Sequence, residues 1–277
     1  MLVNHSVAVH LPHIAYILCL LFFILDAMIF PTALLSFSSA TSVYPMFTNK
    51  EVVRLIQPFL TVPLFSLLYI VGFVLNHQER PNPRESSPRS SRTQLQATVL
   101  PWGLTLNLCF FVLGIVGFCQ GNALHLTANM CSRGWQAAST PSVAEQSVQV
   151  DFWRTYVEHA VAHYFFLTGA VIIFAALLVL FGSVDSPALA ARTAPQKICF
   201  LFACLEMSAL FVAIAFDFPY GRTVFFIVCL VYVLSMGVLY LCRRYPKGFF
   251  NTFWLFCHTS MALTLLGVVI SIGIVGF

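Results

Sequence analysis

Two short stretches of the sequence carry ionisable side chains within otherwise apolar surroundings. The first, QGNALHLTANM, contains His125 and Asn129, and the second, WRTYVEHAVAH, contains Glu158, His159 and His163. Residues four apart on a helix share a face, so His125 pairs with Asn129 and His159 pairs with His163. If the two stretches end and begin neighbouring antiparallel helices, all five side chains converge at one depth.

This predicted cluster has three interpretations, which the sequence leaves open. Imidazoles and carboxylates are the ligands of catalytic zinc or iron, so His125, His159 and His163 could hold a metal. Glu158 or Asp26 would then act as the general base. The order Glu-His-x-x-x-His differs from the His-Glu-x-x-His zinc motif, however. The same groups also fit a pocket for a lipid or small molecule, or a hydrogen-bonded contact that only joins two helices.

Other polar residues lie inside apolar stretches, where an ionisable group costs about 2.5–3.5 kcal/mol on insertion scales. Asp26, in ILDAMIFP, is predicted to reach the depth of the cluster, and Glu206, in CLEMSAL, has no basic residue at its level. Proton-coupled transport through these two acids is a further reading, weakened by the lack of inverted repeats. His258 is predicted to pack against a backbone carbonyl or a hydroxyl.

The composition excludes a soluble globular protein. Of 277 residues, 59% are hydrophobic and only 9% are charged, against roughly 25% charged in soluble domains. Long unbroken apolar runs are typical of membrane helices and unlike the alternating strands of a β-barrel. The formal charge of +4 is carried by a few loops, so it indicates topology and not a nucleic-acid surface. We predict an all-α polytopic membrane bundle that forms a single transmembrane domain over residues 1–277.

Seven transmembrane helices are predicted from the apolar windows. They lie near residues 12–36, 58–76, 99–128, 156–182, 197–216, 223–241 and 250–275. The Pro-, Ser- and Arg-rich segment 77–97 is predicted to be a flexible loop. Nine Lys and Arg residues fall on its side of the membrane and five on the other, which predicts a cytosolic N-terminus and a luminal C-terminus. Loops 37–57 and 129–155 are then the longest luminal exteriors.

The nine cysteines do not form an extracellular disulfide framework, because most lie within the predicted spans. Only Cys119 and Cys131 flank the same luminal end. A disulfide between them stays open, although a continuous helix would hold the two thiols too far apart.

The luminal motifs carry a family resemblance. GNALHLTAN at 121–129 and YVEHAVAH at 156–163 resemble the ceroid-lipofuscinosis neuronal protein six family, which are seven-span proteins of the endoplasmic reticulum. The likeness extends to ILDAMIFP around Asp26 and to CRRYPKGFF followed by HTSMALTLL within 242–266. The chain departs from the family where Asn129 replaces an Asp, and where Glu158 and His159 replace two adjacent acids.

The resemblance implies residence in the endoplasmic reticulum membrane, self-association as a homodimer, and a part in the export of lysosomal enzymes through a partner membrane protein. The first functional hypothesis is therefore the binding of a luminal cargo protein or a membrane lipid at a pocket lined by the His and Glu cluster. The alternative is a membrane-embedded lipid-modifying enzyme, either a hydrolase that uses a divalent metal such as zinc or an acid–base isomerase, acting through the same residues.

Overall fold

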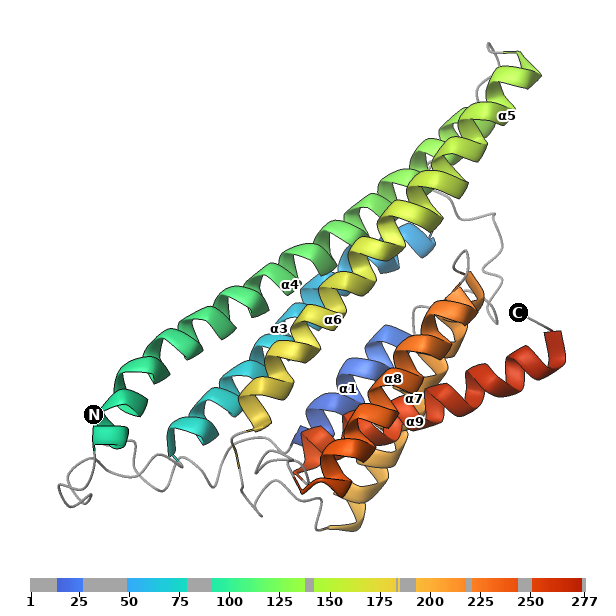
Figure 1. Cartoon of the computed structure of the whole chain (residues 1–277). Coiled ribbons are helices and arrows are strands. Elements are labelled where there is room, and N and C mark those ends of the chain that lie inside the picture. Colours follow the sequence, from blue (N-terminus) through green and yellow to red (C-terminus); the bar gives the residue numbers. More distant parts are fainter. Residues whose placement is uncertain are drawn as a thin grey trace.

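Helices make up every described element of the chain (Figure 1). The computed structural model describes residues 14–26, 49–78, 91–137, 142–182, 184, 193–217, 221–243 and 251–275. The helices are α1 (Ile14–Asp26), α3 (Asn49–Gln78), α4 (Ser91–Ala137), α5 (Val143–Asp151), the π-helix η3 (Phe152–Ala162), α6 (His163–Gly182), α7 (Ala194–Asp217), α8 (Gly221–Leu241) and α9 (Thr252–Val275). The all-α prediction is confirmed for this part of the chain.

Six helical segments are long and apolar enough to cross a membrane. They are Leu55–His77, Gly103–Gln136, Val143–Gly182, Ala194–Phe216, Gly221–Leu241 and Thr252–Ile274. Each overlaps one predicted window. The remaining window, 12–36, contains α1, whose apolar part Ile14–Leu25 is shorter than the other six. This is the architecture of a multi-pass helical membrane protein.

The helices form two groups that lie side by side (Figure 1). In one group, α4 runs antiparallel to the continuous rod formed by α5, η3 and α6, and α3 packs against both. The other group contains α1, α7, α8 and α9. Contacts of α1 with α3 and of α6 with α9 connect the two groups. The predicted antiparallel pairing of the third and fourth spans is therefore present.

The α4–α6 pair is held together at two glycines. A Cβ atom added at Gly169 would collide with the backbone nitrogen of Phe118, and one added at Gly121 would collide with that of Phe166. The two backbones are thus in direct contact, as is common where membrane helices pack through small residues. Beside this seam the core is aromatic: Phe65 and Phe118 pack edge to face, with ring centroids 5.6 Å apart.

Side chains at the start of α9 and just before it bond to carbonyl groups at the end of α6 and just beyond it. Asn251 donates from Nδ2 to the carbonyl oxygens of Phe181 and Val184, at 2.9 and 3.2 Å. Trp254 Nε1 donates to the carbonyl of Leu178 at 3.0 Å. Helix ends leave carbonyl groups without intrahelical partners, so these donors fasten α6 to the start of α9.

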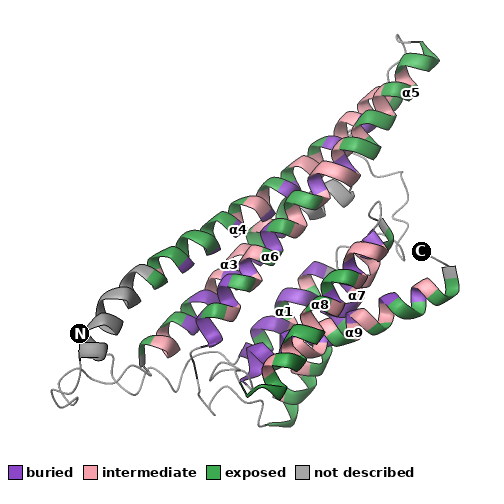
Figure 2. Ribbon diagram, in the orientation of Figure 1, coloured by how far each residue is buried: buried purple, intermediate pink, exposed green. Residues whose placement is uncertain are grey.

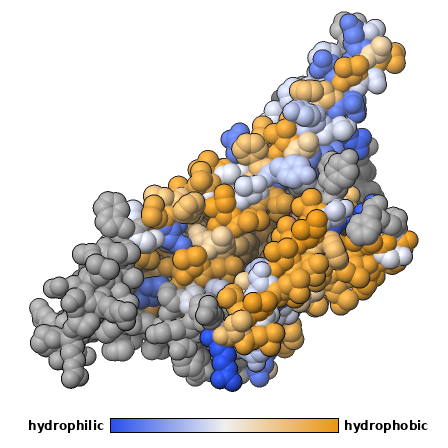
Figure 3. Space-filling model, viewed as in Figure 1, coloured by the Kyte–Doolittle hydropathy of each residue, from blue (hydrophilic) through white to orange (hydrophobic). Residues whose placement is uncertain are grey.

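The outer faces of the helices are exposed and apolar (Figure 2). Figure 3 shows hydrophobic residues over most of the coloured surface, with hydrophilic ones mainly near the end of the α4–α5 hairpin and at the lower edge of the view. A lipid-facing surface explains this distribution, because apolar side chains in contact with acyl chains need no burial inside the protein.

Two predicted loops are partly helical in the structure. The prediction of a loop over residues 129–155 is wrong for most of this segment, because α4 continues to Ala137 and α5 begins at Val143. Likewise α3 extends to Gln78 and α4 begins at Ser91, which shortens the predicted loop 77–97. Hydropathy marks where apolar side chains stop, whereas a helix continues for as long as its backbone bonds and caps support it.

Candidate functional site

The α4–α5 hairpin is longer than a bilayer crossing requires. With 47 residues, α4 is about 70 Å long, whereas the hydrocarbon core of a bilayer is about 30 Å thick. From His125 to Ala137 alone, α4 covers about 18 Å. Figure 1 shows this end of the hairpin projecting beyond the other helices. We call residues 126–137 and 142–162 the arm.

Three predicted site residues bond to one another at the base of the arm. Asn129 Nδ2 donates to Glu158 Oε1 at 3.0 Å, and His125 Nδ1 lies 3.2 Å from the same oxygen. Asn129 Nδ2 also donates to the backbone carbonyl of His125 at 3.0 Å. We call His125, Asn129 and Glu158 the clamp, because it joins α4 to η3.

The geometry of the clamp favours a proton on Nδ1 of His125. Asn129 Nδ2 lies 2.9 Å from this nitrogen, but its two hydrogens are already matched by Glu158 Oε1 and the carbonyl of His125. If Nδ1 carries a hydrogen, it donates to Glu158 Oε1, and every donor in the clamp has an acceptor. The alternative tautomer would set a nitrogen lone pair against a carboxylate oxygen.

The other two predicted histidines lie next to the clamp. The ring of His163 stands edge-on to that of His125, with centroids 4.7 Å apart, and the ring of His159 lies 5.4 Å from that of His163. His159 Nδ1 is buried and has no hydrogen-bond partner among the described residues. The structure therefore brings together all five residues of the predicted cluster. His163 lies between His159 and the clamp.

A π-helix positions the second half of the cluster. The backbone N–H of His163 donates to the carbonyl of Glu158, five residues earlier. In a π-helix, residues five apart in the sequence lie close to the same face, so Glu158 and His163 both face α4. In an α-helix the same spacing would turn one of them away. π-helices are rare and are frequent at functional sites.

The described side chains do not form a ready metal centre. No group of three or more His, Cys, Asp or Glu residues within the described ranges is placed to hold a metal ion. The carboxylate of Glu158 is already bonded within the clamp. The predicted metal site at His125, His159 and His163 is not supported by this arrangement and stays a prediction.

The two predicted intramembrane acids belong to the other helix group. Asp26 is the last residue of α1, and its side chain lies outside the described residues. α1 itself packs against α7 and α3. Glu206 is buried in α7, and its Oε2 has no hydrogen-bond partner in the part of the chain that the structure describes. The structure thus gives no contact between either acid and the clamp.

The remaining sequence predictions concern His258 and two cysteines. His258 Nδ1 lies 3.1 Å from the hydroxyl of Tyr232, which confirms a packed histidine bonded to a hydroxyl. Cys119 and Cys131 are free thiols. Both lie on α4, so a continuous helix separates their Cα atoms by about 18 Å, and no disulfide joins them.

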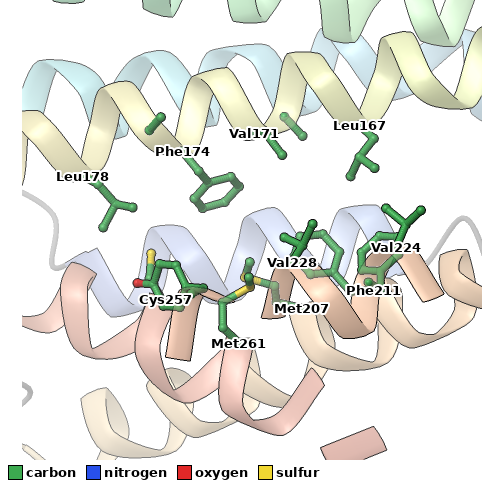
Figure 4. Close-up of a pocket in the computed structure, with 14 residues that line it drawn as sticks. Leu167, Val171, Phe174, Leu178, Met207, Phe211, Val224, Val228, Cys257 and Met261 are labelled. Carbon is green, nitrogen blue, oxygen red and sulfur yellow. The ribbon is translucent and has the colours of Figure 1, made fainter. Parts of the chain in front are cut away.

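Two cavities that the sequence did not predict are lined by residues outside the cluster. The α6–α8 cavity, about 300 Å³, is enclosed by apolar side chains of α6 on one side, including Phe174, and of α7, α8 and α9 on the other (Figure 4). The α3–α4 groove, about 500 Å³, is lined by Pro58, Pro63 and neighbouring residues of α3 and by Asn122 and its neighbours on α4. Neither is lined by a cluster residue, so the predicted pocket of His and Glu is not among them.

Comparison with known proteins gives no relative: no family model, curated protein or solved structure matches the chain.

Proposed function

We propose that the chain is a seven-span protein of the endoplasmic reticulum membrane, with its N-terminus in the cytosol and the arm in the lumen. The six candidate spans together with α1 support seven crossings. The excess of Lys and Arg on the side opposite the arm supports the orientation. The resemblance of the arm and clamp sequences to the ceroid-lipofuscinosis neuronal protein six family supports the compartment.

Within this placement, the arm binds a luminal cargo protein and assists the export of lysosomal enzymes. The observation that carries this proposal is an exposed apolar stripe on the arm, which the proposed placement sets outside the bilayer. Val148 is 66% exposed, Tyr156 is 60% exposed and Phe152 lies between them at four-residue spacing, its ring stacked on that of Tyr156. A group of apolar side chains on a water-exposed surface is typical of a protein interaction site.

The clamp contributes by fixing the two helices of the arm relative to each other. The carboxylate of Glu158, on η3, accepts a hydrogen bond from Asn129 on α4. Separation of the two helices would therefore leave buried polar groups without partners. A rigid arm binds with a smaller loss of conformational entropy than a flexible one. The cluster is thus a positioning device for the cargo surface.

A glycosylation acceptor at the tip tests the orientation. Ala138→Asn creates Asn-Ser-Thr between α4 and α5, and Arg89→Asn creates Asn-Ser-Ser in the loop on the opposite side. We expect a glycan, removable by an endoglycosidase, on the first variant and none on the second, because only luminal acceptors are modified. The reverse result would invert the topology and remove the arm from the lumen.

Photo-cross-linking tests cargo binding. A photoreactive residue at Val148, in membranes that contain a tagged lysosomal hydrolase, should form a covalent product with the hydrolase, whereas one at the exposed Leu241 of α8 should not. Val148→Asp should reduce the rate at which the hydrolase leaves the endoplasmic reticulum, because a charge interrupts the stripe. Ser147→Asp adds the same charge one residue away and is the control. Equal transit in both variants would contradict the proposal.

A further inference from the structure

The α3–α4 groove combines an apolar wall with one unsatisfied polar group. Phe59 and Val62 of α3 and Leu126 of α4 are among its lining residues. Asn122 also lines it, and only 8% of this residue is exposed. Asn122 Nδ2 is buried without a hydrogen-bond partner among the described residues.

An unpaired amide in such a place is costly. Leaving a buried donor unsatisfied costs about 1–3 kcal/mol, and apart from Asn122 itself the described side chains that line the groove offer only the thiol of Cys119, which is a weak acceptor. A ligand that removes this cost has a hydrogen-bond acceptor attached to an apolar body. A water molecule would satisfy the amide but would leave the apolar side chains of the groove in contact with water.

The depth of Asn122 narrows the chemistry of the ligand. Asn122 lies three residues, or about 4.5 Å along α4, from His125 of the clamp. The clamp carries ionisable groups, which are expensive in the hydrocarbon core and are tolerated at its edge. Asn122 is therefore just inside the boundary at which the ester carbonyl groups of membrane lipids lie, with the groove wall continuing among the acyl chains.

We propose that the α3–α4 groove is a binding site for a glycerophospholipid, with Asn122 Nδ2 donating a hydrogen bond to an ester carbonyl and one acyl chain lying along Phe59, Val62 and Leu126. This inference rests on the proposed membrane location but not on cargo binding by the arm. The groove faces α3, whereas the clamp joins α4 to η3, and a lipid there would fill the space between two helices that otherwise leave a groove open.

The test compares two photoreactive phosphatidylcholines that differ only in their linkage. Both carry a diazirine in the acyl chain; one is a diester and the other is a diether, which lacks the carbonyl groups. Each is reconstituted with the purified full chain, and labelled peptides are mapped by mass spectrometry. We expect the diester to label the groove peptides around Phe59 and Leu126 about three- to tenfold more strongly than the diether, the range given by one hydrogen bond.

Three variants assign the effect to the groove. Asn122→Leu keeps the approximate volume without the donor and should abolish the preference for the diester. Ala123→Phe fills the groove and should reduce labelling by both lipids. Ala175→Phe makes the same change in the α6–α8 cavity and should leave groove labelling unchanged. All three are first checked for a monodisperse, folded protein.

Two results would overturn the proposal. Equal labelling by the two lipids in the unaltered chain would show that the carbonyl is not recognised and that acyl chains only pass along the surface. Covalent products between two copies of the chain, formed through groove peptides, would identify a second protomer as the occupant. Neither result bears on the hydrolase cross-link from Val148, so the two proposals fail independently.

Discussion

Replacing Glu158 by Ala is the sharpest perturbation of the clamp. The change removes the oxygen that accepts from Asn129 at 3.0 Å and faces His125 at 3.2 Å. Asn129 keeps its bond to the backbone carbonyl of His125, but the link between α4 and η3 is lost. We therefore expect the arm to open locally while the rest of the protein stays folded.

The expected magnitude follows from the burial of these groups. Removing the acceptor leaves two partly buried donors, the Nδ1–H of His125 and one hydrogen of Asn129, without a partner, at about 1–3 kcal/mol each. Because His125 and Glu158 keep 17% and 10% of their side-chain surface exposed, a total of about 3 kcal/mol is expected. That free energy corresponds to roughly a hundredfold increase in local opening. Glu158→Gln keeps an acceptor and loses the charge, so about 1 kcal/mol and a fivefold increase are expected.

Hydrogen–deuterium exchange with mass spectrometry measures local opening directly. Exchange should accelerate in peptides from the two helices of the arm and remain unchanged in α9. Asp151→Ala removes another acid of the arm, but an exposed one, and should change exchange by no more than about twofold. A Glu158→Ala protein whose arm exchanges within about threefold of the unaltered rate would refute the structural role of the clamp.

Three further outcomes are expected. Gly169→Ala should destabilise the α4–α6 contact by about 1–3 kcal/mol or prevent folding, seen as earlier thermal exposure of the buried thiols, whereas Gly237→Ala, with nothing within 4 Å of an added Cβ, should not. The capping box of α5, in which Ser142 bonds Glu145, holds the pKa of Glu145 below its ordinary value of 4.5. The folded-state pKa is depressed, so this stabilisation is present above pH 4.5 and lost as the pH falls through the folded-state pKa. Exchange of the α5 amides, corrected for intrinsic rates, should then rise, and Glu145→Gln should remove that dependence. Elemental analysis of the purified protein should give well below one zinc or iron per chain; a stoichiometric metal lost on His163→Ala would instead support the alternative of a lipid-modifying hydrolase.

The convergence of the cluster was predictable because it depends on local rules. Helical spacing sets His125 and Asn129 on one face, and consecutive membrane spans run antiparallel, so the end of one span lies at the depth of the start of the next. Those two facts are enough to bring Glu158 to the same depth. The helical character of the arm was also readable in principle, since Ser142 followed by Glu145 is a capping box, but hydropathy alone stops at the membrane edge.

Other features arise only from tertiary contacts. The π-helix that turns both Glu158 and His163 toward α4 has no signature in the sequence, because its five-residue bonding is selected by packing against the partner helix. The α3–α4 groove depends on how far apart two helices stand, which composition does not determine. Asn122 is conspicuous only once the groove beside it is known.

The attachment of α6 to α9 bears on how the chain assembles. The acceptors at Phe181 are translated 70 residues before their donor, Asn251. A nascent chain therefore completes the α4–α6 hairpin before Asn251, the donor that fastens one end of it, has been translated. Substitutions at Asn251 should consequently act on a segment made much earlier, and they are expected to produce insertion intermediates that quality control can recognise.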